Sequence, residues 1–325
     1  MNDLTGQRVA VTGASGFIGA RVVERLVLET GGKVRALVRG FGRVARLSVL
    51  PQERLGFRIA DLDRPESLEE ALRDCDLVVH CAFGNRGGEE PRWRTTVDGT
   101  AHLLAAAKRA GVRRLVHIST VDVYDTTGLT RFDEDSPGLA ADPADREYEQ
   151  QKAAAERLVL AAHGDGPAMT VLQPGVVYGP WGGQWTTAQL TRPAAEFEAL
   201  PAAGAPGVCN AVYVDDVADA AVAALTAPRV AGERFLLNGP GTVGWGDFFD
   251  RVRDLRGLPA PAGAPSAGVV PDWELALYSG RAHADAARAA TALGAPRVTF
   301  QDGMDLTARW ARWAGYAAGA DGAGR

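Results

Sequence analysis

The stretch VAVTGASGFIGARVVERL, residues Val9–Leu26, joins an apolar strand-like run to a helix-like run through three glycines. Gly13, Gly16 and Gly19 form the pattern G-x-x-G-x-x-G. Such a turn needs unusual backbone angles, a close approach of the backbone to a pyrophosphate, and a helix that packs near the sheet. Free N–H groups at the helix start then bind the phosphates. A tight turn without a ligand is the alternative, but the position of the motif after a strand favours dinucleotide binding.

Short β-rich runs alternate with helical stretches rich in Ala, Leu and Arg. The expected strands are apolar on both faces, which is typical of a parallel sheet covered by helices on both sides. The pattern therefore predicts an α/β fold with a doubly wound parallel sheet. After Gly232, Gly/Pro-rich connectors separate short helices, as expected of a smaller second domain. The alternating segments are residues 8–13, 19–30, 33–39, 66–73, 76–82, 99–111, 114–120, 148–160, 169–177 and 212–225.

Composition narrows the possible partners. Of 325 residues, 46% are hydrophobic and 23% charged, and the net charge of −5 gives no basic footprint for nucleic acid. No apolar stretch approaches the ~18–20 residues of a membrane span. The first expected strand begins near Gln7, which leaves no room for a signal peptide before it. We therefore expect a cytoplasmic protein with no membrane partner. Cys75, Cys81 and Cys209 lack C-x-x-C spacing and the five histidines are scattered, so we expect neither disulfides nor a metal site.

The second expected strand, KVRALVRG, ends where an NAD-selective site carries an acidic residue for the ribose hydroxyls. Val38 and Arg39 stand there instead. A guanidinium can bind a 2′-phosphate through two hydrogen bonds, and Arg43 follows closely, so the sequence favours NADP(H) and leaves NAD(H) open. The alternative is that Arg39 only solvates the strand end. Further cofactor contacts are expected after the third and fourth strands, at Asp61, Leu62, Cys81, Ala82 and Phe83.

Tyr148 and Lys152 form Y-x-x-x-K in a stretch that predicts a helix, and this spacing places both side chains on one face. A nearby ammonium favours the phenolate, so we expect the pKa of Tyr148 to fall from about 10 towards working pH. The phenol could then give or take a proton at a carbonyl or alcohol oxygen. Thr120, at the end of RLVHIST, is the candidate hydroxyl that orients that oxygen. Y-x-x-x-K alone is common on surface helices. Its position after the glycine turn and after the Ser-Thr at a strand end favours the catalytic interpretation.

Together these features resemble the extended short-chain dehydrogenase/reductase superfamily, in its epimerase- and dehydratase-like group. The resemblance covers nearly the whole chain. It rests on TGASGFIG, DLD near Asp61, VVHCAF, HISTVDVYD, EDSP at Glu134 to Pro137, YEQQKAAAERL, LQPGVVYGP, VYVDDVADA and GMDLTARWARWAG.

The resemblance implies an NAD(P)-dependent oxidoreductase with a small-molecule substrate, and it leaves a homodimer open. It implies a Rossmann domain at residues 1–175 plus about 205–232 and a smaller α/β substrate domain at about 176–204 plus 233–316, and we expect a disordered tail at 317–325. By the family pattern Thr120 holds the substrate oxygen, Tyr148 is the acid/base, and Lys152 tunes the tyrosine and holds the nicotinamide ribose. Other implied cofactor contacts are Gly13, Ser15, Gly16, Phe17, Ile18, Gly19, Pro174, Val176 and Val177.

Departures from the family pattern narrow the reaction. Dehydratases of the family read S-T-D-E-V-Y, whereas this chain has Val121 in the first acidic position, and valine cannot transfer a proton. Nucleotide-sugar enzymes tend to carry Asn where Val176 stands, and Arg where this chain has Cys209 and Asn210. Both usual diphosphate contacts are therefore missing, and Arg192 could replace them only by another geometry.

Aromatic residues stand where a substrate would be contacted. Phe83, Trp93, Trp181 and Trp185 suggest an apolar or aromatic ketone, although the tryptophans could equally pack between the domains. The inserted segment 84–93 is either a flap over the site or a solvated loop. The sequence thus predicts an NADP(H)-dependent ketoreductase or dehydrogenase. A nucleotide-sugar epimerase with tightly bound NAD and a dinucleotide-binding sensor of the same fold are the alternatives, and the intact Thr120, Tyr148 and Lys152 set speaks against the sensor.

Overall fold

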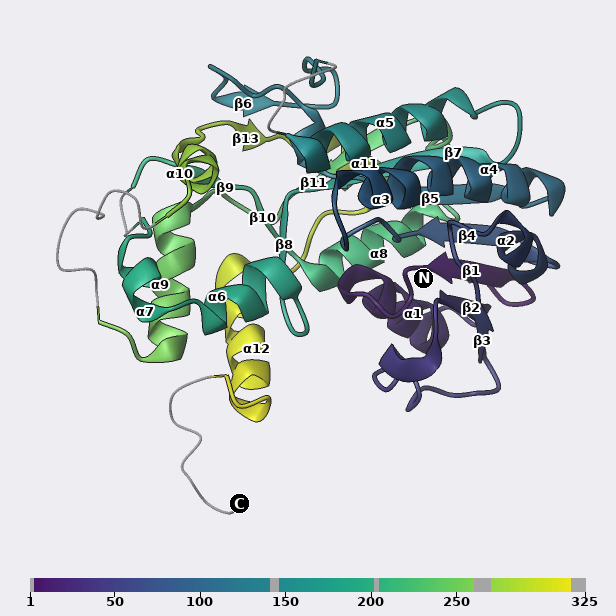
Figure 1. The fold of residues 1–325 in the computed structure, drawn as a ribbon, viewed down its shortest axis with the longest axis horizontal. Coiled ribbons are helices and arrows are strands. Elements are labelled where there is room, and N and C mark those ends of the chain that lie inside the picture. The colour runs from purple at the N-terminus through teal and green to yellow at the C-terminus, as the bar shows by residue number, and fades with distance from the viewer. Residues whose placement is uncertain (1–2, 141–145, 202–204, 260–269, 317–325) are drawn as a thin grey trace.

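A seven-stranded parallel sheet forms the larger lobe of the molecule (Figure 1). The computed structural model describes residues 3–140, 146–201, 205–259 and 270–316; the tail for which we predict disorder lies outside these ranges. The strand order is β11-β7-β5-β4-β1-β2-β3. The strands are β1 (Arg8–Thr12), β2 (Lys33–Val38), β3 (Leu55–Ile59), β4 (Leu77–His80), β5 (Arg114–Ile118), β7 (Ala168–Pro174) and β11 (Arg234–Leu237). The predicted doubly wound α/β fold is confirmed.

The order of the strands reverses between β1 and β4, which both pair in parallel with each other and with outer neighbours. In an open α/β sheet, ligands bind in the crevice beyond the carboxyl ends of the strands at such a reversal. The segments that follow β1 and β4, Gly13 and Cys81–Ala82, meet at this point, because a Cβ added to Gly13 would lie 2.9 Å from the Ala82 nitrogen. The topology therefore places the glycine turn at the mouth of the crevice.

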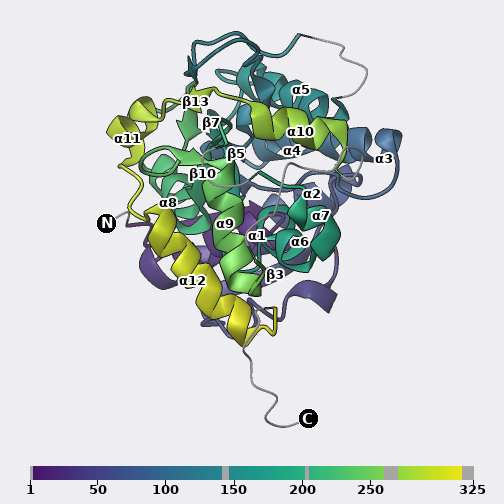
Figure 2. The ribbon, with the colours of Figure 1, turned by 90° about the vertical axis from the view of Figure 1, so that its left-hand side faces the viewer.

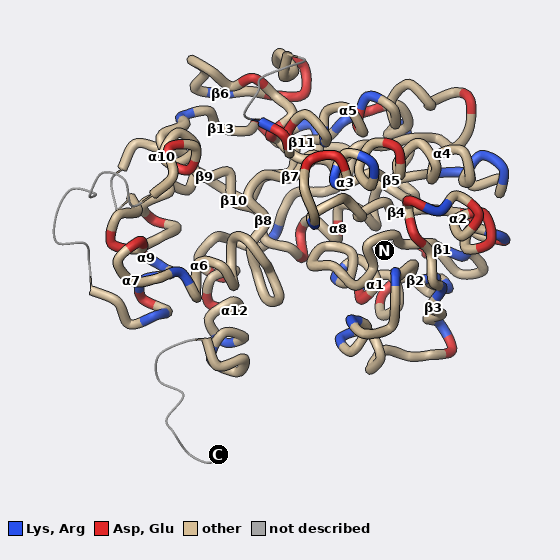
Figure 3. Tube along the Cα trace, in the orientation of Figure 1, with Lys and Arg blue, Asp and Glu red and all other residues tan. Residues whose placement is uncertain are grey.

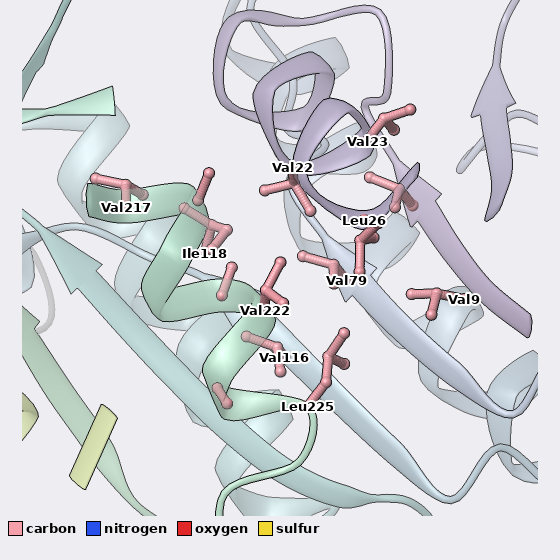
Figure 4. Close-up of a cluster of buried hydrophobic side chains, with 14 of the residues drawn as sticks. Val9, Val22, Val23, Leu26, Val79, Val116, Ile118, Val217, Val222 and Leu225 are labelled. Atoms are coloured by element: carbon pink, nitrogen blue, oxygen red, sulfur yellow. The ribbon is translucent and has the colours of Figure 1, made fainter. Parts of the chain in front are cut away.

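Helices cover both faces of this sheet. On one face, α1 (Phe17–Glu29) and α8 (Val214–Ala224) pack on the strands through aliphatic side chains (Figure 4). On the other face lie α2 (Pro65–Leu72), α4 (Gly99–Arg109) and α5 (Glu147–Ala161). Successive residues of a strand point to opposite faces, so Val9 and Val11 belong to one cluster and Ala10 to the other. This explains why the strands are apolar throughout.

The glycine turn is built from close backbone contacts. Gly13 has φ of +63°, a conformation that favours glycine, and Gly16 begins α1 as its N-cap. A Cβ on Gly19 would lie 2.3 Å from the carbonyl oxygen of Gly13, so helix and turn can approach this closely only with glycine. The N-terminal end of α1 is thereby held next to the crevice.

The smaller lobe has its own core, which lies beside the carboxyl ends of the sheet strands (Figure 2). Its buried aromatic residues include Tyr178, Phe197, Trp245, Phe248 and Phe249. Its elements are β8 (Val176–Tyr178), α6 (Ala188–Thr191), α7 (Ala194–Glu198), β9 (Val208–Cys209), β10 (Ala211–Tyr213), β12 (Val243–Gly244), α9 (Trp245–Arg256), α10 (Asp272–Ser279) and α12 (Phe300–Trp313). Shorter elements include α3 (Glu89–Trp93), β6 (Arg131–Phe132), β13 (His283–Ala284) and α11 (Ala287–Leu293).

One predicted domain boundary is wrong. We expected residues 233–316 in the smaller domain, but β11 pairs with β7 as the edge strand of the main sheet. The Gly/Pro-rich composition that suggested the boundary at Gly232 begins only after this short apolar strand. Conversely, β9 and β10 lie in the predicted Rossmann segment 205–232, yet Cys209, Ala211 and Tyr213 belong to the core of the smaller lobe. The other domain bounds stay predictions.

Charges of both signs are interspersed over the two lobes (Figure 3). Where α1 and α8 meet, Arg21 and Arg25 bind Asp215 at 2.5 and 3.0 Å, which ties the two helices together above their apolar contact. Within the described residues, no helix is long and apolar enough to cross a membrane.

Candidate functional site

A cavity of about 160 Å³ lies at the carboxyl ends of β1 to β4. Its walls come from the glycine turn, the end of β2 and the segments after β3 and β4. The predicted cofactor residues that line it are Gly13, Ser15, Gly16, Arg39, Asp61, Leu62, Cys81, Ala82 and Phe83. Asn85 and Thr95 also line it and were missed, because they belong to or follow the inserted segment, which carries no recognisable motif. A larger hollow of about 600 Å³, lined by residues of α8 and α11 among others, contains no predicted site residue.

The residues that line the cavity are of the types expected to bind one end of a dinucleotide. The turn at Gly13 presents backbone where a side chain would collide, and backbone N–H groups at the start of α1 are the ordinary donors to a pyrophosphate. Arg39 and Arg43 line the same cavity at the end of β2, where a 2′-phosphate on the adenosine ribose would need cations. Phe17 and Ile18 instead pack against the core of the smaller lobe, and Gly19 packs on Gly13.

The predicted catalytic residues meet beside this cavity. Thr120 directly precedes a 3₁₀ turn after β5, and Tyr148 and Lys152 lie one turn apart on α5. Lys152 Nζ donates to the carbonyl oxygen of Ile118 at 2.6 Å, which anchors α5 to the end of β5. The Phe83 ring contacts Tyr148 edge to face at 5.9 Å and lies 5.9 Å from Lys152 Nζ. Three separate segments thus bring a hydroxyl, a phenol, an ammonium and an aromatic ring together.

The expected lowering of the Tyr148 pKa is wrong for this structure. Burial of the hydroxyl end raises the pKa of Tyr148, the Asp122 carboxylate adds to the rise, and hydrogen bonding to Thr120 opposes it. The Lys152 ammonium donates to the Ile118 carbonyl. Burial lowers the pKa of Lys152 to about 8, while Glu156 acts in the opposite direction. At neutral pH the site therefore holds a protonated phenol beside an ammonium, a combination that can donate a proton.

Glu156 connects the elements that carry the site. It is buried one turn beyond Lys152 on α5. Its Oε2 accepts a hydrogen bond from Ser119 Oγ at 2.6 Å, and Gln173 Nε2 donates to both carboxylate oxygens at 2.9 and 3.0 Å. Burial raises the pKa of Glu156, whereas these hydrogen bonds lower it. Because Ser119 precedes Thr120 and Gln173 precedes Pro174, this carboxylate fixes the ends of β5 and β7 against α5.

The residues predicted along the nicotinamide lie where β7 passes into β8. Pro174 is buried at the end of β7, and Val176 and Val177 are half-buried beside the core of the smaller lobe. The Val176 N–H donates to the Asn210 carbonyl at 2.7 Å, which holds this segment against β10. Pro174, Val176 and Val177 do not line the 160 Å³ cavity.

The predicted substrate-facing aromatics separate into two groups. Phe83 and Trp93 are 40% and 39% exposed, and Phe83 contacts Tyr148. Trp181 instead packs against Trp310 and Trp313 of α12, with ring centroids 5.7 and 5.9 Å apart. Trp185 packs on Trp245 at 5.1 Å. The structure therefore brings Phe83 to the predicted catalytic side chains. Trp181 packs at the edge of the smaller lobe, and Trp185 packs on its interior.

Residues at the usual diphosphate-contacting positions are engaged in internal contacts. Cys209 is buried, and burial raises the pKa of its thiol. Asn210 donates to the Ala282 carbonyl at 3.0 Å and accepts from the Ala284 N–H at 2.9 Å. Arg192 is bound to Glu274 at 2.8 Å in a pair whose side chains are only 11% and 10% exposed.

Metal-ligand clusters are absent from the described part of the chain: no three His, Cys, Asp or Glu residues gather in it so as to hold a metal ion. The three cysteines are free.

Comparison with known proteins gives one family and a mixed set of activities. The sequence model of the NAD-dependent epimerase/dehydratase family matches residues 9–237. Sterol demethylase protein B of Methylococcus capsulatus is 30% identical over 257 residues, which cover 77% of this chain and 75% of that protein. Dihydroflavonol 4-reductase of Zea mays is 32% identical over 248 residues, covering 69% and 68%. The solved structure of DesIV, a dTDP-glucose 4,6-dehydratase from Streptomyces venezuelae with NAD bound, has a TM-score of 0.78 at 25% identity and covers 96% of this chain and 99% of that one.

The Glu156 contacts generate a stability prediction. Glu156→Ala leaves two buried donors, the Ser119 hydroxyl and the Gln173 amide, without their acceptor, and such losses cost about 3 kcal/mol. The melting temperature should then fall by roughly 5 °C or more in a thermal unfolding experiment. Glu69→Ala is the matched control: Glu69 pairs with Arg109 on the surface, where both side chains are about half exposed, and a change within about 0.5 kcal/mol is expected. Equal shifts for the two variants would contradict the role given to Glu156.

Proposed function

This chain belongs to the NAD-dependent epimerase/dehydratase family, and we propose that within it the protein is an NADP(H)-dependent ketoreductase or dehydrogenase acting on an apolar or aromatic small molecule. The observation that carries the proposal is the meeting of Thr120, Tyr148 and Lys152 beside the exposed ring of Phe83. A proton donor next to an apolar surface is suited to a ketone with little hydrogen-bonding capacity of its own.

The chain's own residues divide the work of carbonyl reduction. When bound, the nicotinamide supplies the hydride to the carbonyl carbon. Tyr148 donates its proton to the carbonyl oxygen, and its raised pKa keeps that proton in place at neutral pH. Thr120 orients the oxygen, and Lys152 would hold the nicotinamide ribose. The sum is one carbonyl, one NADPH and one proton converted to one alcohol and one NADP⁺, and the reverse reaction uses the same groups.

The positions that usually contact a sugar-nucleotide diphosphate support this proposal over the epimerase. Val121 offers no proton-transferring group, and Cys209 is buried. Arg192, the one substitute that the sequence suggests, already pairs with the buried Glu274. To bind a diphosphate it would have to leave a carboxylate that is itself 10% exposed, and breaking such a buried pair is costly. The likeness to DesIV covers the whole fold but does not supply these missing contacts.

A screen of ketones tests the proposed function directly. Acetophenone, 4-chromanone and 2-decanone are each incubated with NADPH, and the loss of the nicotinamide absorbance is compared with the alcohol formed. We expect one NADPH consumed per ketone reduced, and no thermal stabilisation by UDP- or dTDP-sugars, since a ligand of the native state would raise the melting temperature. Isomerisation of such a sugar without net loss of NADPH would instead establish the epimerase.

Cofactor preference is predicted from the end of β2. Arg39 and Arg43 line the cavity, so NADPH should bind more tightly than NADH. Arg39→Asp removes a charge-assisted contact to the 2′-phosphate and should shift the ratio of the two dissociation constants by about 10- to 100-fold towards NADH. Nicotinamide fluorescence titration measures this. Arg113→Asp, which makes the same charge change on an exposed side chain before β5, should leave the ratio as in wild type; equal wild-type affinities would refute the preference.

Proton donation by Tyr148 predicts a specific kinetic loss. Tyr148→Phe keeps the ring that contacts Phe83 but removes the hydroxyl, so kcat for ketone reduction should fall by roughly 10²-fold or more. Cofactor affinity should stay close to that of wild type. Steady-state kinetics and cofactor titration of the same preparation separate the two effects. Near-normal turnover would mean that another group or water protonates the oxygen.

A further inference from the structure

Thr120 makes two hydrogen bonds to one neighbouring residue, Asp122. Its Oγ1 donates to Asp122 Oδ2 at 2.8 Å and accepts from the Asp122 backbone N–H at 3.2 Å. Asp122 lies in the 3₁₀ turn Val121–Val123, for which Thr120 is the N-cap, so the pair is held together by the local backbone. The hydroxyl assigned to orient the substrate is therefore already engaged.

Counting donors and acceptors shows what this engagement leaves available. A threonine hydroxyl has one proton to donate and two lone pairs, and an ionised carboxylate can only accept. With Asp122 ionised, the Thr120 proton is directed to Asp122 and one lone pair is taken by the backbone N–H. The remaining lone pair can accept from a substrate hydroxyl. In this state Thr120 has no proton to offer a carbonyl oxygen.

We propose that Asp122 is a positioning residue whose protonation state decides whether Thr120 donates to a ketone or accepts from an alcohol. This inference rests on the proposed function. A protonated Asp122 donates its own O–H to Thr120 Oγ1, and the Thr120 proton then turns to the carbonyl oxygen, where Tyr148 also donates. An ionised Asp122 retains the Thr120 proton, and the free lone pair receives the alcohol hydroxyl; because an alcohol has one proton, that proton is then not directed to Tyr148, and this form binds the alcohol without oxidising it. Asp122 neither gains nor loses a proton in the chemical step, which remains hydride transfer to carbon and transfer of the Tyr148 proton to oxygen.

The surroundings of Asp122 favour its protonated form more than water does. Burial raises the pKa of this carboxyl, while the hydrogen bond from Thr120 and the Arg146 guanidinium lower it. The Asp122 carboxylate also acts on Tyr148, a titratable group on the first turn of α5. The carboxyl therefore binds a proton at higher pH than an ordinary aspartate.

The first measurement uses the protein without substrate. In protein carrying ¹³C-labelled aspartate, Asp122→Asn identifies the Asp122 carboxyl resonance by its loss, and the resonance is followed by NMR through a pH titration. We expect the wild-type pKa above the ordinary aspartate range, and a further rise in Thr120→Val, because the charged carboxylate loses its hydrogen-bond donor. An Asp122 pKa that is the same in wild type and Thr120→Val overturns the inference.

The second measurement is the pH profile of kcat/KM for reduction of acetophenone by NADPH. Wild type should lose about tenfold per pH unit above the Asp122 pKa found by NMR, because only the protonated form lets Thr120 donate. In Asp122→Asn the amide donates to Thr120 at every pH, so the fall should disappear over that range. Asp125→Asn is the control, since Asp125 caps a nearby exposed turn through the Thr127 N–H and should keep the wild-type profile.

The two measurements separate this inference from the proposed function. A purely structural role for Asp122 would lower the activity of Asp122→Asn by one factor at all pH values and leave the shape of the profile unchanged, which contradicts the inference. A wild type that reduces none of the three ketones overturns the proposed function and with it the selection of ketone over alcohol. The NMR titration still decides in that case whether Asp122 holds the Thr120 proton.

Discussion

The contact between α5 and the carboxyl ends of β5 and β7 is the interaction on which the site depends. Lys152 binds the Ile118 carbonyl, and Glu156 binds Ser119 and Gln173, so one helix face is joined to two strands by four hydrogen bonds. These groups are buried, where an unsatisfied polar atom costs more than in water. The contact places Tyr148 against Thr120 and also leaves Lys152 with its lowered pKa of about 8. Stability and proton chemistry thus depend on the same residues.

The reversal of strand order between β1 and β4 supplies the second half of the site. It opens a crevice in which the glycine turn, Arg39 and Phe83 line one cavity, although they are far apart in sequence. The same Phe83 contacts Tyr148, so this cavity and the Tyr148 phenol share a wall. The proposed dinucleotide site and the proposed proton donor therefore lie side by side.

Sequence predicted those parts of the site that depend on local spacing. The glycines fix a turn by their own conformational freedom, and residues four apart on a helix share a face, so Gly13 and the Tyr148–Lys152 pair could be placed in advance. Glu156 was missed because its partners, Ser119 and Gln173, come from other strands. The Arg192–Glu274 pair joins residues 82 apart, and no pattern signals it. The Tyr148 pKa was predicted in the wrong direction, because the burial of its hydroxyl end and the Asp122 carboxylate that faces it are consequences of folding.

The most direct test of the proposed carbonyl reduction follows the hydrogen that is transferred from the cofactor to the ketone. The protein is incubated with acetophenone and NADPH that carries deuterium at the transferable position, and the product and the cofactor are analysed by mass spectrometry. The account predicts one deuterium on the carbinol carbon of each alcohol molecule and one free NADP⁺ for each alcohol formed. The contradicting result is an alcohol-free mixture with no oxidised cofactor, while a UDP- or dTDP-sugar supplied in place of the ketone is isomerised.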